Sequence, residues 1–246
     1  MKRFSWRVRL GAGLVAVTVV IVIVNLIVFG SPEETGFWML HSISMLPIEV
    51  LLTVLVLNAL LERRARQELL NKLNMVIGAF FSEVGSELLR RIADFDTDVT
   101  CREEFLIKGN WDARRFEQAR LAIGAYDFAV DATHGDLVDL RAFLVSKRPF
   151  LLGLLENQSL MEHESFTDAL WAVFHLAEEL EFRPDMSNLP RSDLAHLAVD
   201  MRRAYAALAV EWLRHVEHLK AMYPYLYSLA LRTNPLDPSA SVVVTE

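Results

Sequence analysis

The stretch FWMLHSISMLPIEVLLTVLVLNALL, residues 37–61, contains a single charged residue, Glu49. At about 1.5 Å per residue, a helix of this length crosses the roughly 30 Å hydrocarbon core of a bilayer. A second stretch, LGAGLVAVTVVIVIVNLIVF, occupies residues 10–29 and carries no charge. The linker SPEETG between the two stretches is long enough only for a tight turn. We therefore predict an N-terminal transmembrane hairpin of two helices, with spans at about 10–29 and 37–61.

Basic residues flank this predicted hairpin on its outer sides and are absent from its linker, which carries Glu33 and Glu34. The flanking bases are Lys2, Arg3, Arg7, Arg9, Arg63, Arg64 and Arg66. Because basic flanks stay on the cytoplasmic side, we expect a multi-pass protein of a prokaryotic cell (inner) membrane with both termini in the cytoplasm. A cleaved signal peptide over residues 1–30 is the alternative interpretation, but the apolar run is longer than a usual signal core.

Several polar side chains fall inside the predicted spans. In an antiparallel hairpin centred on the linker, Glu49 faces the depth of Thr18, and Asn25 faces a level next to His41. A carboxylate in mid-bilayer costs roughly 3 kcal/mol or more, so Glu49 calls for an explanation. One interpretation is a protonated Glu49 that hydrogen-bonds Thr18 or a carbonyl freed by Pro47 and so holds the hairpin or an oligomer together. The other is a group that handles ions or protons.

Composition excludes several classes of protein. The chain has 246 residues, with 32 acidic against 25 basic side chains and a formal net charge of −7, so it lacks the electrostatic footprint of a nucleic-acid binder. Cys101 is the single cysteine, which excludes an intrachain disulfide and any multi-cysteine metal site. Phosphate-binding, hydrolase and metalloprotease motifs are absent. The sequence requires no cofactor and favours a non-catalytic role.

Residues 62–96 carry apolar side chains at every third or fourth position, which predicts a long amphipathic juxtamembrane helix. We expect this helix to continue the second span without a break. Gly78, Ser82 and Gly85 lie on one narrow face of it. Small side chains there would let another helix approach closely, or would make a flexible patch.

Residues 97–232 are predicted to form a cytoplasmic helical bundle, and residues 233–246 an extended C-terminal tail. A capping box at Thr100 and Glu103 predicts a short helix closed by Gly109. Other caps, glycines and prolines predict helices over 112–132, 136–147, 149–161, 165–183 and 192–222. On the helix from residue 165, His175 and Glu179 lie opposite the apolar face and are expected to be solvated. The fold class that follows is all-α.

Two predicted helix faces carry metal-ligand residue types at the same spacing. They comprise Glu211, His215 and His218 on the last long helix, and Asp127, Asp131 and His134 on an earlier one. If the two helices faced each other, these side chains could hold a metal ion. The alternative is a core histidine with a hydrogen bond and acids paired with arginines.

Together these patterns favour a non-catalytic interaction or regulatory module of the membrane. Its expected partners are the lipid bilayer and either a second copy of itself or another membrane protein, with no nucleic acid. Two further hypotheses remain open: an oligomeric transporter or proton-coupled component that uses Glu49, and a metal-binding helical enzyme or sensor.

Overall fold

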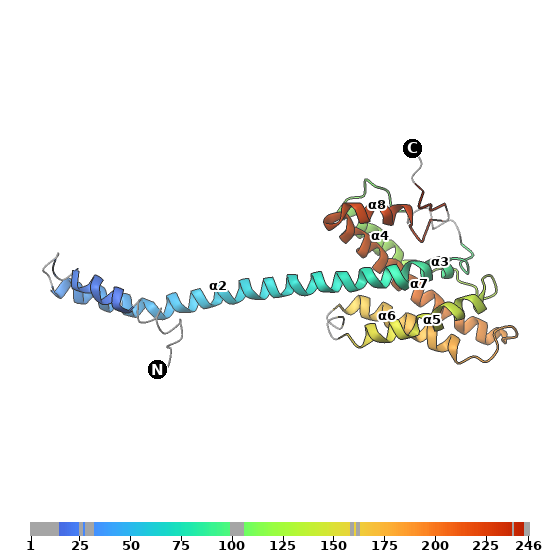
Figure 1. Cartoon of the computed structure of the whole chain (residues 1–246), viewed down its shortest axis with the longest axis horizontal. Helices are drawn as coiled ribbons and strands as arrows, with labels where there is room; N and C mark the ends of the chain where they lie inside the picture. The colour runs from blue at the N-terminus through green and yellow to red at the C-terminus, as the bar shows by residue number, and fades with distance from the viewer. Residues whose placement is uncertain are drawn as a thin grey trace, which may run out of the picture. The chain divides into compact units, whose positions relative to one another are not determined.

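A computed structural model describes residues 15–24, 27, 32–98, 106–157, 160, 163–237 and 239–243. These described residues form helices and contain no strand, apart from an isolated bridge between Asp96 and Val130 (Figure 1). The prediction of an all-α fold is therefore confirmed. The chain divides into two compact units, Met1–Arg66 and Gln67–Glu246.

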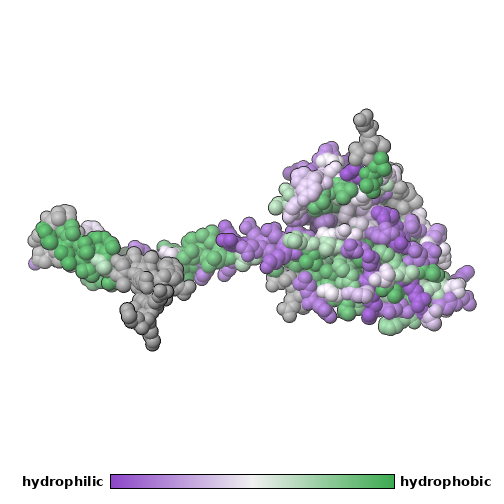
Figure 2. All heavy atoms as spheres, viewed as in Figure 1, coloured by the Kyte–Doolittle hydropathy of each residue, from purple (hydrophilic) through white to green (hydrophobic). Residues whose placement is uncertain are grey.

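The first unit contains the helical segment Val15–Val24 and the beginning of α2, which spans Pro32–Phe80. Of the described residues, one continuous helical run, Gly36–Ala93, contains a segment long and apolar enough to cross a membrane. Its apolar side chains in this unit are exposed, and Figure 2 shows hydrophobic residues gathered on this part of the chain. The span predicted at 10–29, and with it the hairpin, stays a prediction.

The second unit is built around one central helix, α7 (Arg191–Met222). Four shorter helices and a π-helical turn pack against α7, and a further helix, α5, packs against α6 and α3 (Figure 1). Their bounds are η1 Phe81–Gly85, α3 Ser86–Ala93, α4 Ala113–Ala125, α5 Leu137–Leu155, α6 Glu164–Glu181 and α8 Pro224–Arg232. Aliphatic and aromatic side chains from all of these elements form one hydrophobic core.

The predicted juxtamembrane helix is observed as α2, η1 and α3 in unbroken succession. The π-helical turn η1 inserts extra backbone into the helix and so changes which side chains face inward. As a result Phe80 and Phe81, which are neighbours in sequence, are both fully buried, and their rings meet edge to face. Gly85 makes this possible, since a Cβ atom there would lie within 3 Å of both rings.

Local capping signals place several helix starts close to the predicted positions. The Asp112 side chain accepts a hydrogen bond from the Arg115 N–H and begins α4. Asp136 does the same for α5 with the Asp139 N–H. Each cap satisfies one of the backbone donors that a helix leaves unpaired at its first turn.

The predicted helix break before Pro149 is wrong, because α5 continues through it to Leu155. Proline normally kinks or ends a helix, since it has no N–H and crowds the preceding turn. Here the leucines on both sides of Pro149, Leu144 and Leu151, are fully buried in the core. Burial of one continuous helix face outweighs the lost hydrogen bond.

The predicted helix over 112–132 is also too long, because α4 ends at Ala125. Tyr126 adopts an extended backbone, and its hydroxyl donates a 2.7 Å hydrogen bond to Asp98. Phe128 then packs against Tyr205 of α7. Aromatic contacts with other elements thus redirect the chain into a loop that continues to Asp136. The capping box at Thr100 and Glu103 lies outside the described residues, and residues 106–109 at the end of that predicted helix are not helical.

Candidate functional site

A cavity of about 620 Å³ lies between the end of α2, η1, α7 and α8, and we call it the α2–α7–α8 cavity. Its lining is mainly apolar and aromatic, with several hydroxyl and amide groups, two histidines and one arginine. These residues are Asn71, Asn74, Met75, Gly78, Ala79, Phe81, Ser82, Ser86, Arg90, Trp212, His215, His218, Leu219, Tyr223, Leu226, Leu229, Ala230 and Thr233. This size and this composition are typical of small-molecule sites.

The floor of the cavity is an aromatic cluster that joins η1 to α7. The Phe81 ring stacks on the His215 imidazole with centroids 5.2 Å apart, and it meets Trp212 edge to face at 5.3 Å. Gly78 allows α2 to approach at this point, because a Cβ atom there would already be 3.5 Å from Cε1 of His215. The extra backbone of η1 turns Phe81 toward α7, so the cavity depends on that irregular turn.

The histidines of this cavity are held uncharged. Burial, with a smaller contribution from the nearby His218, lowers the pKa of His215 to about 4. Burial also lowers the pKa of His218. Nδ1 of His215 and Nε1 of Trp212 are buried and have no hydrogen-bond partner within the part of the chain that the structure describes. Unpaired buried polar atoms of this kind cost about 1–3 kcal/mol each.

Glu211, His215 and His218 do lie near one another on α7, but they do not converge as metal ligands. The buried Glu211 carboxylate accepts a 2.5 Å hydrogen bond from Arg214, which also donates to Ser165. The His215 ring instead stacks on Phe81 and lies tilted against Trp212. The acid is therefore paired with an arginine as in the alternative interpretation, whereas the buried histidine has no partner at Nδ1 among the described residues.

Asp127, Asp131 and His134 lie in the loop after α4, so the helical spacing that linked them is wrong. Asp127 pairs with Arg202 of α7 at 2.8 Å, which places it roughly 13 Å along α7 from Glu211 at about 1.5 Å per residue. Asp131 accepts hydrogen bonds from the backbone and hydroxyl of Thr133. The structure therefore does not bring the two predicted groups together.

The predicted intramembrane residues are placed as follows. His41, Pro47 and Glu49 lie within α2, and Thr18 lies within the segment Val15–Val24. Asn25 lies outside the described residues. Proline is tolerated inside a membrane helix where neighbouring groups satisfy the freed carbonyl.

The predicted small-residue face is divided between two structural uses. Gly78 faces α7 and Ser82 lines the α2–α7–α8 cavity. Gly85 instead faces Phe80 and Phe81 of its own helix. Close approach of a second helix along this face stays a prediction.

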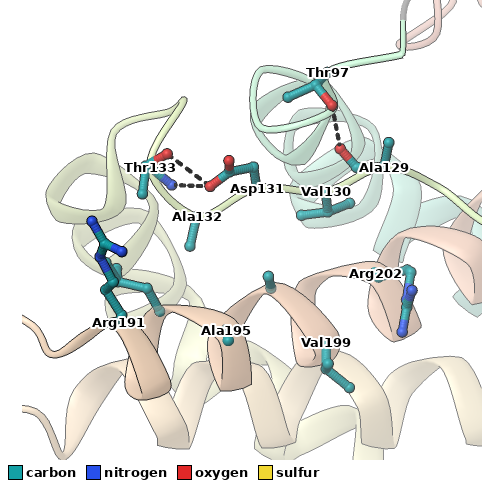
Figure 3. Close-up of a pocket in the computed structure, with 12 residues that line it drawn as sticks. Thr97, Ala129, Val130, Asp131, Ala132, Thr133, Arg191, Ala195, Val199 and Arg202 are labelled. Atoms are coloured by element: carbon teal, nitrogen blue, oxygen red, sulfur yellow. Dashed lines mark hydrogen bonds between the residues drawn. The ribbon is translucent and has the colours of Figure 1, made fainter.

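A second cavity, of about 700 Å³, opens between α7 and the loop after α4. Figure 3 shows Arg191 and Arg202 at opposite ends of the α7 segment that lines it, with Ala195 and Val199 between them. On the loop side, the Thr97 hydroxyl donates to the Ala129 carbonyl. Thr97 and Arg202 are thus occupied by contacts with Ala129 and Asp127, so this cavity is the weaker candidate for a binding site.

The expectation that His175 and Glu179 are solvated holds in part, since the His175 side chain is 45% exposed and that of Glu179 is 28% exposed. Both face α7, where they meet His196 and Asp200. We call these four side chains the α6–α7 cluster. Sequence reasoning missed it because partners on another helix cannot be read from one helix wheel. A usable signal was present, since each helix carries a histidine followed four residues later by an acid.

Comparison with known proteins divides the chain in two as well. Residues 2–61 match the family model described as the MJ1433 N-terminal helical domain, and residues 69–232 match the one described as uncharacterized protein MJ1433, C-terminal helical domain. The uncharacterized protein MJ1433 of Methanocaldococcus jannaschii is 41% identical over 233 residues, which cover 95% of this chain and 94% of that protein. No solved structure matches the chain.

Proposed function

We propose that this chain, which belongs to the MJ1433 family, is a membrane-anchored regulatory module whose C-terminal helical domain binds an amphipathic small molecule in the α2–α7–α8 cavity. The observation that carries the proposal is the cavity itself, which joins an apolar wall to donor groups at a volume suited to one small molecule. Binding rather than catalysis is favoured, because the described lining contains no carboxylate and no cysteine.

The charge of the lining favours an acidic or oxygen-rich head group on the ligand. Arg90, which also forms an ion pair with Glu87, is the one charged side chain among the described lining residues, and burial lowers the pKa of both histidines. A cationic head group would find no counter-charge in the cavity. Asn71, Asn74 and Ser82 add hydrogen-bonding groups. The ligand class is therefore a carboxylic acid or similar oxygen acceptor with an aliphatic body.

Membrane attachment is part of the same proposal. The uncharged stretch 10–29 and the apolar surface of α2 support two spans with both termini in the cytoplasm. Asn71 lines the cavity and follows, on the same helix α2, the predicted span that ends at Leu61.

Reporter fusions test the topology separately from ligand binding. An alkaline phosphatase fusion after Glu34 should be active and one after Glu246 inactive, because the enzyme folds only outside the cytoplasm. A fluorescent protein at the same two positions should give the opposite pattern. An active phosphatase at the C-terminus would contradict the proposed orientation.

Photo-crosslinking tests the cavity. Full-length protein in lipid nanodiscs is irradiated with a twelve-carbon fatty acid that carries a diazirine, and the modified peptides are identified by mass spectrometry. We expect labelling on η1, α7 and α8, reduced by competing dodecanoate and not by dodecylamine. Gly78→Leu places a bulky side chain at the α2 wall and should lower labelling roughly tenfold.

The matched control is Gly153→Leu on α5. Gly153 has nothing within 4 Å of the position that a Cβ atom would occupy, so a leucine fits there without reaching the cavity. This variant should be labelled like the wild type. Equal labelling of both variants, or labelling spread evenly over α2, would contradict the proposed site.

A further inference from the structure

The α6–α7 cluster contains two histidines and two carboxylates in a closed arrangement. His175 and Glu179 come from α6, and His196 and Asp200 come from α7. Because α6 and α7 run antiparallel, the histidine of each helix faces the acid of the other. The distance from Nε2 of His175 to Oδ2 of Asp200 is 3.6 Å, and that from Nε2 of His196 to Oε2 of Glu179 is also 3.6 Å.

The pairs within each helix complete the arrangement. Nε2 of His196 lies 3.3 Å from Oδ2 of Asp200, and Nε2 of His175 lies 3.9 Å from Oε1 of Glu179. Ligand atoms of Glu179, His196 and Asp200 all lie within 4.8 Å of one another. In a four-coordinate site with bonds of about 2.0–2.1 Å, neighbouring ligand atoms are roughly 3.4 Å apart. The cluster is therefore close to the size that a bound metal ion requires.

Asp200 provides an independent observation that points to a ligand. Its side chain is only 3% exposed, and Oδ1 accepts a 2.8 Å hydrogen bond from Arg203. Its other oxygen, Oδ2, is buried between the two histidine rings and has no hydrogen-bond partner among the described residues. A buried carboxylate oxygen without a donor is costly, whereas a cation between the two imidazoles would satisfy it.

Arg183 supports the cluster from outside. It donates a 2.9 Å hydrogen bond to Oε2 of Glu179 and holds Asp193 through two bonds of 2.7 Å. These contacts restrain the Glu179 carboxylate beside His196. Groups that orient a metal ligand in this way are a regular feature of protein metal sites.

We propose that the α6–α7 cluster is a binding site for a divalent first-row transition metal such as Zn²⁺, with Glu179, His196 and Asp200 as ligands and His175 as the adjoining fourth. Imidazole nitrogen combined with carboxylate oxygen suits zinc, iron or manganese, whereas calcium and magnesium prefer oxygen alone. Both histidines are about half exposed, so an ion reaches the site from solvent. The bound metal crosslinks α6 to α7.

Metal titration of the full-length protein tests this site. The protein is stripped with a chelator, exchanged into metal-free buffer in detergent, and titrated with Zn²⁺ by calorimetry and with Co²⁺ by visible absorption. We expect about one ion per chain and the intense Co²⁺ bands of a four-coordinate site. Asp200→Asn and His196→Gln should each weaken Zn²⁺ binding at least tenfold. Glu179→Gln, at a more exposed ligand, gives the same test if a buried substitution harms folding.

His134→Gln is the matched control, because His134 also lies 3.3 Å from an acid, Asp131, but at an exposed loop without further ligands. It should bind Zn²⁺ like the wild type. Gly78→Leu should also bind normally, which separates this site from the cavity. Stoichiometry well below one ion per chain, or equal losses in His134→Gln and His196→Gln, would overturn the proposal.

Discussion

The two halves of α7 belong to one helix and yet have opposite surroundings. The first half presents His196 and Asp200 to the polar side chains of α6. The second half presents Trp212 and His215 to Phe81 of η1. Both halves also bury apolar side chains in the core, such as Leu197 and Leu213, so the halves differ in their polar and aromatic contacts.

The comparison shows that partners on other helices decide the chemistry of a histidine. His196 is half exposed and lies beside two carboxylates. His215 is buried between aromatic rings, and burial lowers its pKa to about 4. The polar half of α7 is therefore suited to a cation, and the apolar half to an uncharged or acidic amphiphile. Four predictions test this difference.

The largest effect is expected at the aromatic packing of the apolar half. Phe81 is 1% exposed and contacts Phe80, Trp212 and His215. Phe81→Ala should lower the free energy of unfolding by about 3–5 kcal/mol, measured by denaturant titration of the full-length protein. Phe182 is 75% exposed, so Phe182→Ala serves as a control with little effect. Similar decreases in the free energy of unfolding for both variants would contradict the conclusion that aromatic packing at Phe81 stabilises the domain.

A smaller effect is expected on acidification. His215 has a folded-state pKa of about 4, below its ordinary 6.5, so the unfolded chain takes up the proton first. The free energy of unfolding therefore has its full value above about pH 6.5 and decreases as the pH falls toward 4, because the buried ring resists protonation. The loss is on the order of 3 kcal/mol at about 1.4 kcal/mol per pH unit.

The measurement compares wild type with His215→Phe by unfolding at pH 7 and pH 4.5. The wild type should lose more stability than the variant between these two values, because other titrating groups are common to both. His134→Gln, which changes an exposed ring, should keep the wild-type dependence. Parallel pH profiles for wild type and His215→Phe would show that His215 is not buried uncharged.

A decrease of about 1 kcal/mol in the free energy of unfolding is expected when Arg183, which supports the polar first half of α7, is replaced by methionine. The Arg183 hydrogen bonds are the main cause of the lowered pKa of Asp193, and Arg183→Met removes them. We expect its destabilisation to shrink in high salt, because the partly exposed ion pairs of the wild type are screened there. Arg191→Met, at an exposed neighbouring arginine, is the control. A salt-independent loss would indicate packing by the arginine stem instead.

The smallest effect is expected at an exposed ion pair between the loop after α4 and α7. Asp127 is 85% exposed at its side chain and pairs with Arg202 at 2.8 Å. Asp127→Asn should change the free energy of unfolding by less than about 0.5 kcal/mol, since exposed pairs contribute little. If Asp127→Asn and Arg183→Met lowered the free energy of unfolding equally, the ion pairs of Arg183 would stabilise the protein no more than an exposed pair does.

Local signals predicted several elements closely. The helix predicted over 192–222 agrees closely with α7 at Arg191–Met222. Apolar side chains at helical spacing predict this helix, and Pro224 predicts where it ends. The unbroken succession of α2, η1 and α3 followed from one continuous period. Periodicity and capping depend only on residues within one segment, so these helix positions, predicted from them, agree with the structure.

Predictions that needed a neighbouring segment were less successful. Pro149 does not end α5, because buried leucines on both sides keep the helix against the core. Residues 126–132 leave the helix, because Tyr126 bonds to Asp98 and Phe128 packs on Tyr205. Each outcome depends on a contact with residues far away in sequence.

The sequence by itself determined the all-α class, the long apolar helix and the faces on which polar residues lie. Tertiary structure decided which faces meet. It paired His175 and Glu179 with His196 and Asp200, and it closed the cavity by setting Phe81 against His215. The physical reason is that helical periodicity specifies the direction of a side chain around its own axis, whereas the partner it meets depends on how the helices pack.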